Sequence, residues 1–369
     1  MISHSEGTRN FCGRNARARG LHSSGSTCRG FSLPELLVSM AVLLVVAGGV
    51  ISIISFNVKT YGRTEQQSDM YENVRAVAEL MAQEIGQAGL VGLPSGATGE
   101  TLSAAVTFNS TTAQTVAVSS TAAMYVGENL LIDTNANEEP VTLAAVTSTS
   151  ISAISPQSVH PSHNPGAAVH AVGVAPNGIV APSSSATTPG GVSCVTVPTG
   201  VTYTSPATTP STCNVLNLWG DTNSDGTLVY VRYTCNAPTS TAPGTLTRSV
   251  TTITPGVNTV STAQTLLSTL ILNPPNAALA SPLNTEPSPC FQYDLSTQQI
   301  NGITYYMVAN VGLTISVQTL KPDPITNQYL QMTKSFLDLS PRNILAGYEQ
   351  AYWGDASRLQ NQPPNINSY

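Results

Sequence analysis

An uninterrupted apolar stretch near the start of the chain is the strongest pattern in the sequence. The 23 residues from Leu36 to Val58 carry no charged side chain, and Glu35 comes directly before them. At a rise of about 1.5 Å per residue, a helix of this length crosses a hydrocarbon core of about 30 Å. We therefore predict a membrane-spanning helix. A carboxylate at its head is costly in hydrocarbon unless a partner neutralises it, so Glu35 is a candidate functional residue.

The residues that follow are amphipathic with helical spacing. Between Thr64 and Gly89, apolar side chains recur at steps of three and four residues, which is the period of one helical face. They are Met70, Val74, Val77, Met81, Ile85 and Ala88. Glycines and Pro94 then end the pattern. The sequence predicts one helix from about Ser32 to Ala88, with its first half in lipid and its second half packed on a sheet.

Strand patterns dominate the second half of the chain. β-branched and aromatic residues alternate with polar ones in segments 228–233, 305–320 and 329–339, as half-buried strands require. We expect these segments to form an antiparallel sheet that covers the apolar face of the helix. The predicted fold class is α+β, and residues 211–369 form the sheet and a C-terminal tail.

A separate small all-β insertion is predicted at residues 101–173. Four short segments within it have strand composition, and turn-forming residues separate them. They are 116–118, 124–133, 140–146 and 150–154. A meander that belongs to the main sheet is the alternative. The next stretch, 174–210, includes a Ser-, Thr- and Pro-rich run from Pro182 to Pro210 and is expected to be a linker.

Composition and charge fit an exported protein better than a cytosolic enzyme. Of the 369 residues only 9% are charged and 6% are aromatic, and Ser, Thr, Ala, Gly and Pro are abundant. The first 30 residues hold five arginines and one acidic residue, Glu6, which favours a cytoplasmic location for that end. The net charge is −6, so the rest of the chain carries about −10. Its cationic residues are dispersed, and no nucleic-acid surface is predicted.

The residues around Glu35 resemble a known export signal. The run is Arg29-Gly30-Phe31-Ser32-Leu33-Pro34-Glu35. With the apolar stretch after it, this run resembles the class III signal of type IV prepilins and pseudopilins. The resemblance implies that a prepilin peptidase cuts between Gly30 and Phe31, removes the leader 1–30 and methylates the new amine. It also implies that Glu35 neutralises the N-terminal amine of a neighbouring subunit during assembly. A plain signal anchor is the alternative.

Three further segments carry a more detailed resemblance. They are Glu79–Leu90, Thr227–Tyr233 and Phe336–Asn343. These segments resemble the helix end, the strand that follows an Asp-Gly turn and the closing strand of PilW-type minor pilins and J-type minor pseudopilins. The implied fold is pilin-like. Residues 31–58 are then the membrane-spanning half of the long helix, and residues 59–100 are its periplasmic half with the exit loop.

The resemblance sets the functional expectations. The chain is expected to be a minor pilin that primes or caps a type IV pilus; the alternatives are a minor pseudopilin of a type II secretion system and a pilin-anchored surface adhesin. Expected partners are the prepilin peptidase, other pilins or pseudopilins and the inner-membrane assembly platform. The expected location is the inner membrane, single-pass with a periplasmic C-terminal domain, and then the filament tip. Residues 101–173 also resemble a small β-barrel module of bacterial surface proteins, which favours the adhesin alternative.

The cysteines divide between the two sides of the span. Cys12 and Cys28 lie in the leader, and four others follow the span. They are Cys194, Cys213, Cys235 and Cys290. In an oxidising compartment these four are expected to form two disulfides. Three pairings are possible, and proximity along the chain favours Cys194–Cys213 with Cys235–Cys290. Their spacing is not that of a zinc site.

One acidic turn is a weak candidate for calcium. Asp221, Asn223 and Asp225 come before Gly226 and match the first half of a calcium-binding loop. Arg232 stands where such a loop supplies its bidentate glutamate, and a cation there repels calcium. An Asx-rich turn that leads into the next strand explains the same residues.

Three histidines lie close together, but no catalytic motif accompanies them. His160, His163 and His170 fall within eleven residues, and their Pro- and Gly-rich surroundings predict a surface loop rather than a metal site. The sequence has no G-x-S-x-G, no H-E-x-x-H and no phosphate-binding glycine loop. We expect neither enzyme activity nor a cofactor.

Overall fold

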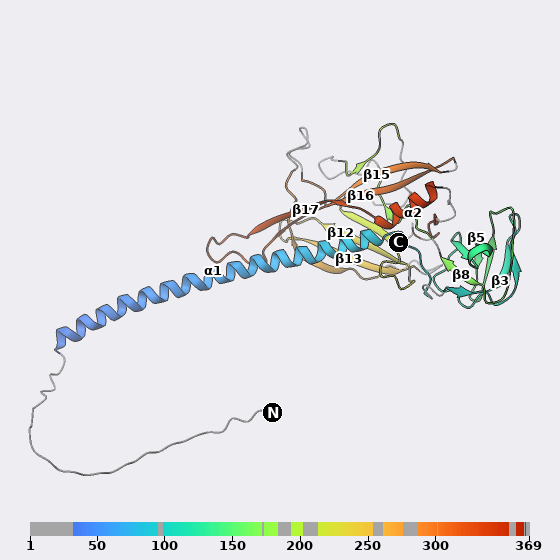
Figure 1. Cartoon of the computed structure of the whole chain (residues 1–369). Helices are drawn as coiled ribbons and strands as arrows, with labels where there is room; N and C mark the ends of the chain where they lie inside the picture. Colours follow the sequence, from blue (N-terminus) through green and yellow to red (C-terminus); the bar gives the residue numbers. More distant parts are fainter. Residues whose placement is uncertain are drawn as a thin grey trace, which may run out of the picture. The chain divides into compact units, whose positions relative to one another are not determined.

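The computed structural model describes residues 32–94, 99–171, 173–183, 193–201, 213–253, 261–275, 287–300, 302–353, 359–364 and 366. The chain divides into two compact units, Met1–Val58 and Lys59–Tyr369. Among the described residues, every β-strand belongs to the second unit (Figure 1).

The long helix α1, Leu33–Gln87, has bounds close to the predicted range. Pro34 lies in its first turn, where the missing backbone N–H removes no intrahelical hydrogen bond. Two residues after the helix, Gly89 has a φ of +77°, which suits glycine at a helix end. A Cβ atom at this position would lie 2.5 Å from the carbonyl oxygen of Ala175. Glycine is therefore needed where the chain leaves the helix.

The two halves of α1 have different surroundings. The most apolar window of the helix has a mean hydropathy of 2.7, and none of it is buried. The first half is therefore the candidate membrane span. The second half buries one face. Its buried side chains are Met70, Val74, Val77, Ala78, Met81, Glu84 and Ile85. This face contains five of the six apolar residues that the helical period predicted, and the sixth, Ala88, is buried directly after the helix ends.

A nine-stranded sheet packs against the buried face of α1. Its strand order is β10-β15-β16-β14-β13-β12-β11-β9, and β17 pairs with β16. The bounds are β9 Ile179–Val180, β10 Val195–Thr196, β11 Val215–Gly220, β12 Val229–Asn236, β13 Gly244–Thr252, β14 Gln264–Leu270, β15 Phe291–Ile300, β16 Ile303–Gln318 and β17 Gln331–Leu339. All pairs are antiparallel except β10 with β15. The three predicted strand segments correspond to β12, β16 and β17.

One buried ionic contact joins the helix to the sheet. Glu84 of α1 is 5% exposed and pairs with Arg248 of β13. The hydroxyl of Tyr233 in β12 donates to the same carboxylate. Apolar side chains of the helix and of most strands surround this contact in one core. The fold is thus the α+β pilin-like arrangement, a long apolar helix followed by antiparallel sheets.

The main sheet curls, so strands far apart in its order come together. Four strands separate β15 from β11 in that order. Even so, the hydroxyl of Tyr293 in β15 donates to the carbonyl oxygen of Val215 in β11 at 2.7 Å. The backbone N–H of Phe291 donates to the carbonyl oxygen of Cys213, just before β11, at 3.0 Å. The two arms of the sheet therefore meet.

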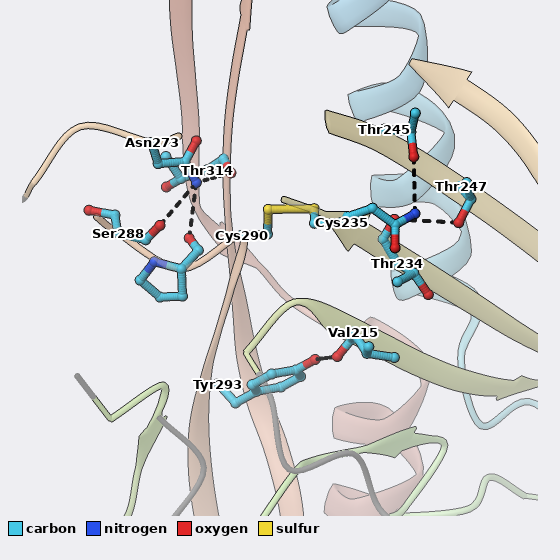
Figure 2. The surroundings of a disulfide bond; sticks show 12 residues. Val215, Thr234, Cys235, Thr245, Thr247, Asn273, Ser288, Cys290, Tyr293 and Thr314 are labelled. Carbon is cyan, nitrogen blue, oxygen red and sulfur yellow. Dashed lines mark hydrogen bonds between the residues drawn. A yellow bond between two sulfur atoms is a disulfide. The ribbon is translucent and has the colours of Figure 1, made fainter. Parts of the chain in front are cut away.

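Two disulfides bridge the arms of the curled sheet. Cys194 pairs with Cys213, with Cα atoms 5.6 Å apart, and Cys235 pairs with Cys290, with Cα atoms 6.5 Å apart. Cys235 lies in β12, and Cys290 directly precedes β15. Figure 2 shows this second bridge near the hydrogen bond between Tyr293 and Val215. These are the pairs that proximity along the chain favours.

A second, six-stranded sheet precedes the main sheet in the sequence. Its order is β1-β8-β4-β5-β6-β3, and β2 pairs with β7 beside it. The bounds are β1 Glu100–Thr101, β2 Val106–Thr107, β3 Gln114–Ala117, β4 Asn129–Ile132, β5 Glu139–Val146, β6 Ser150–Ile154, β7 Ser162–His163 and β8 Ala168–Ala171. A 3₁₀ turn, Asn135–Asn137, lies between β4 and β5. The strands enclose an apolar core of their own. We call residues 100–171 the inserted unit.

The structure differs from several expectations in local detail. The strand expected at 124–133 is limited to β4, because Ala123 and Gly127 have φ values of 64° and 90° and turn the chain before it. The expected linker 174–210 supplies β9 and β10 to the main sheet. The C-terminal tail contains a helix, α2 Arg342–Tyr352. A Cβ atom on its Gly347 would overlap Val174, so glycine permits close packing there.

The segment 359–364, which we call the C-terminal strap, connects the inserted unit to the rest of the domain. Leu359 forms a parallel bridge with Val174, and the backbone N–H of Gln360 donates to the carbonyl oxygen of Val174 at 2.9 Å. The side chain of Gln360 accepts from the backbone N–H of Asn129 at 2.8 Å and donates to its carbonyl oxygen at 2.6 Å. The side chain of Asn129 donates to the carbonyl oxygen of Leu359 at 2.8 Å.

Candidate functional site

The head of α1 presents a carboxylate beside an apolar surface. Glu35 lies in the first turn, where the partial positive charge of a helix N-terminus favours an anion. Ser32 Oγ donates to Glu35 Oε2 at 3.4 Å, and the N–H of Leu36 donates to the carbonyl oxygen of Ser32 at 3.2 Å. Among the described residues, no basic side chain pairs with Glu35. The carboxylate is therefore available to a partner from outside the chain.

The surface that follows Glu35 is apolar and uncovered. Every residue from Ser32 to Tyr61 is exposed in the isolated chain, and Leu44 and Val45 reach 71% and 77%. An apolar surface of this extent requires lipid or other helices around it. No other group lies within 4 Å of the Cβ positions of Gly48 and Gly49, so a second helix can approach closely there.

The predicted processing residues adjoin this surface in the sequence. Gly30 and Phe31 lie outside the described residues. A cut between them makes Glu35 the fifth residue of the shortened chain.

The four cysteines that follow the span have a structural role in this fold. Cys194, Cys213 and Cys235 are at most 5% exposed, and all four are paired. A disulfide sulfur is neither a thiolate ligand nor a nucleophile. Across the described residues, no group of three or more His, Cys, Asp and Glu is arranged to hold a metal ion.

The acidic turn before β12 directs its oxygens at the backbone. Asp221 Oδ1 accepts from the N–H of Asp225 at 3.0 Å, and Oδ2 accepts from the N–H of Gly226 at 2.8 Å. Asp225 Oδ1 accepts from the N–H of Thr227 at 2.8 Å, and this hydrogen bond lowers the pKa of Asp225. Asn223 Nδ2 donates to Asp225 Oδ2 at 2.6 Å. The geometry is that of an Asx turn, and calcium binding here stays a prediction.

The surface-loop prediction is wrong for His163. This residue lies in β7, paired with β2, and its side chain is fully buried. Its Nε2 is 2.8 Å from Glu139 Oε2, and its Nδ1 is 3.3 Å from Asp133 Oδ2. His160 Nδ1 is 2.8 Å from Glu139 Oε1. His170 lies in β8. The Pro- and Gly-rich composition gives no strand signal here, because β7 and β8 have only two and four residues.

Glu139 holds this group of side chains together. Its side chain is fully buried, and burial alone raises the pKa of a carboxyl group. Hydrogen bonds from Ser155, His160 and His163 outweigh burial, so the pKa of Glu139 is lower than its ordinary value. Every ring nitrogen of His163 faces a carboxylate, which makes this a closed internal network rather than a site open to a ligand.

A second buried carboxyl in the inserted unit has a different environment. Glu128 is fully buried, and burial raises its pKa to about 8, although the N–H of Tyr125 donates to its Oε2 at 3.1 Å. Its Oε1 has no hydrogen-bond partner among the described residues. Glu128 is therefore mostly neutral at pH 7. The sequence analysis places this residue inside the strand expected at 124–133, where a charged side chain gives no signal that it is buried.

Comparison with known proteins points to the head of α1. The family described as the prokaryotic N-terminal methylation motif matches residues 25–51. This range contains Gly30, Phe31 and Glu35, together with most of the apolar stretch. No curated protein and no solved structure matches the chain. Within α1 the match extends from the first residue of the helix to Ile51 and does not reach the sheets.

Proposed function

Because this chain carries a class III signal of the type IV pilin kind, we propose that it is a minor pilin that primes or caps a type IV pilus. The observation that carries the proposal is the methylation motif at residues 25–51 at the head of a long, uncovered apolar helix. The motif points to a membrane-anchored, single-pass structural protein rather than an enzyme. The finer assignment to a minor pilin of the PilW type rests on the resemblance of the helix end, β12 and β17.

The first step of the proposed function is processing at the membrane. A prepilin peptidase cuts between Gly30 and Phe31 and methylates the amine of Phe31. Five arginines in the leader keep the cut on the cytoplasmic side. The leader 1–30 leaves, and segment 31–58 remains as the membrane anchor with the domain in the periplasm.

The second step is association through the exposed half of α1. Glu35 of one subunit pairs with the N-terminal amine of its neighbour, because a lone carboxylate is costly in hydrocarbon and an opposite charge neutralises it. Attraction between the two charges is stronger in that low-dielectric surrounding than in water. Other pilins and the inner-membrane assembly platform supply the neighbouring helices. Gly48 and Gly49 allow these helices to approach closely.

The inserted unit supports a position at the filament tip. It adds a six-stranded sheet with its own core to the sheet that packs on α1. We propose the division into leader 1–30, membrane half 31–58, periplasmic helix and exit loop 59–100 and small β module 101–173. Segment 174–210 supplies β9 and β10 to the main sheet, and segment 211–369 supplies its other strands. A subunit at the tip has no neighbour above it, so this extra bulk meets no obstacle there. A minor pseudopilin of a type II secretion system shares the same stem and processing.

Replacement of Glu35 tests the proposal. In Glu35→Gln the neighbour's amine loses its partner, and we expect incorporation into pili to fall about tenfold or more, the effect of losing about 1.4 kcal/mol at the contact. Processing does not need this carboxylate, so mass spectrometry still finds a mature chain that begins at N-methylated Phe31. Immunoblots of sheared pili and of membranes measure the two outcomes. Glu72→Gln, the same change at an exposed position of the outer helix, is the matched control.

Three results contradict the proposal or a part of it. Normal incorporation of Glu35→Gln excludes the assembly role of the carboxylate. A native terminus at Met1, or one beyond Phe56, excludes prepilin processing altogether. Recovery of the chain with a secretion pseudopilus instead of a pilus selects the pseudopilin alternative.

A further inference from the structure

The loop between β16 and β17, residues 319–330, displays apolar side chains to the outside. Leu320 is 76% exposed, Tyr329 is 48% exposed and Ile325 is 43% exposed. Elsewhere in the second unit such exposed apolar residues are scattered over the described surface, whereas here three fall within ten positions. A concentration of this kind calls for a partner.

The loop is rigidly built in spite of its exposure. Asp323 at its centre is fully buried. Its carboxylate accepts from the N–H of Ile325 at 3.0 Å and from the hydroxyl of Thr326 at 2.8 Å. The backbone N–H of Asp323 donates to the carbonyl oxygen of Gln328, and the N–H of Asn327 donates to the carbonyl oxygen of Asp323, both at 2.8 Å. The apolar side chains are therefore presented in a fixed arrangement.

Contacts with α1 fix the level of the loop along the helix. Arg63 Nε is 3.8 Å from Asp323 Oδ2, and the Cβ position of Gly62 is 3.9 Å from Pro324. Burial raises the pKa of Asp323, but the hydrogen bond from Ile325 and the charge of Arg63 help to bring it below its ordinary value. The carboxylate is thus ionised at pH 7 and holds the loop against the helix.

This level lies directly beside the end of the apolar stretch. Gly62 follows Val58 by four residues, or roughly 6 Å along a helix. The headgroup layer extends about 5–8 Å beyond the hydrocarbon core on each side. A loop fixed to Gly62 and Arg63 is therefore at headgroup depth when Val58 marks the end of the hydrocarbon core.

We propose that loop 319–330 is an interfacial membrane anchor that inserts Leu320, Ile325 and Tyr329 into the headgroup region around α1. The composition fits this occupant, since tyrosine is favoured at the boundary between lipid and water and Lys321 can contact lipid phosphate. Tyr61, 76% exposed on α1, adds a second aromatic ring at the same level. The inference depends on the membrane span and not on a role in pili.

Lipid fits the loop better than a second copy of the chain does. The loop contacts Gly62 and Arg63, four and five residues after Val58. A bilayer whose hydrocarbon core ends at Val58 has its headgroup layer at these two residues, so lipid is present there without any further assembly. The anchor gives the domain a second attachment to the membrane surface. It must detach when the subunit leaves the bilayer.

Fluorescence in lipid vesicles tests the anchor. The full chain is reconstituted into vesicles of phosphatidylcholine and phosphatidylglycerol, in a Trp353→Phe background that removes the most exposed tryptophan. Trp219 is fully buried and reports on folding. Tyr329→Trp is the reporter. Val159→Trp, at a position 76% exposed in the inserted unit, is the matched control. Vesicles with brominated acyl chains quench only tryptophans that enter the lipid.

We expect the Tyr329→Trp signal to shift to the blue in vesicles and to lose intensity in brominated ones, whereas the Val159→Trp signal changes in neither. Bromine near the headgroup end should quench more than bromine near the chain end, because interfacial insertion reaches only about 5–10 Å. Ile325→Trp repeats the measurement if Tyr329→Trp is misfolded. Equal quenching of reporter and control, or none at either loop position, overturns the proposal. A blue shift that appears only at high protein density, without quenching by brominated lipid, also overturns the proposal. That result would indicate contact between copies of the chain.

Discussion

Buried carboxyl groups in this protein are accommodated in three different ways. Glu84 pairs with Arg248 between the helix and the main sheet. Glu139 accepts hydrogen bonds from His160 and His163 inside the inserted unit. Glu128 forms no ion pair within the described part of the chain, and its raised pKa of about 8 leaves it mostly neutral at pH 7. Removal of a hydrogen-bonding partner is therefore expected to destabilise the protein more at Glu84 and Glu139 than at Glu128, because only the first two carboxyl groups retain a charge.

Replacement of Glu139 tests the histidine network. In Glu139→Gln the amide has one acceptor atom instead of two charged ones, so one histidine loses its hydrogen bond. We expect the free energy of unfolding at pH 7 to fall by about 1–3 kcal/mol, measured by chemical denaturation. Glu138→Gln, the same change at the exposed neighbour, should have an effect within about 0.5 kcal/mol.

The same pair of variants has an expected pH dependence. The pKa of Glu139 is lower in the folded protein than its ordinary value of 4.5. Its contribution is then complete above about pH 4.5 and is lost as the pH falls through the lower folded value. The stability difference between the parent and Glu139→Gln should shrink in acid. A difference that stays constant from neutral to acidic pH would contradict an ionised Glu139.

At the scale of elements, the helix and the longer strands follow from local patterns. The period of three and four residues predicts the face of α1 from Met70 to Ile85, and alternation predicts β12, β16 and β17. These patterns suffice because each element has enough residues to repeat them. Strands β7, β9 and β10 have two residues each and exist only through partners far along the chain. Their pairing, and with it the buried state of His163, has no local signal.

Val77 tests whether α1 is part of the domain core. It is 7% exposed and packs in the core shared by the helix and the main sheet. Val77→Asp places an unpaired charge there, and we expect a loss of about 3–5 kcal/mol with cooperative unfolding of the main sheet. Circular dichroism and the fluorescence of Trp219 follow the transition.

The neighbouring position supplies the control for that experiment. Ala76 is exposed on the opposite face of α1, so Ala76→Asp introduces the same side chain in water. It should cost no more than about 0.7 kcal/mol, the difference in helix propensity. If both variants melt like the parent, the outer half of α1 is a solvated stalk and its place in the core is refuted.

At the scale of the whole domain, the two disulfides hold the meeting arms of the curled sheet. Cys194–Cys213 closes a separation of 19 residues, and Cys235–Cys290 closes one of 55. A longer closed loop restricts the unfolded chain more. The second bridge also joins β12 to the start of β15. In the strand order of the main sheet these two strands are four positions apart.

Paired serine variants measure the two bridges separately. Cys235→Ser with Cys290→Ser should lower the free energy of unfolding by about 4 kcal/mol, and Cys194→Ser with Cys213→Ser by about 3 kcal/mol. Chemical denaturation of each variant beside the oxidised parent gives both values. An unchanged midpoint in either double variant would mean that the arms meet without help from that bridge.

The C-terminal strap has a consequence for the order of events during synthesis. Tyr125 donates through its hydroxyl to the carbonyl oxygen of Asn361 at 2.8 Å, across a separation of 236 residues. Asn361 in turn donates to the carbonyl oxygen of Gly127 at 2.8 Å. The described strands of the inserted unit pair with one another, so this unit can fold before the strap has been synthesised. Its contacts with the strap can form only after almost all of the remaining polypeptide has been synthesised. A chain that ends before the strap therefore contains a folded inserted unit that lacks these contacts.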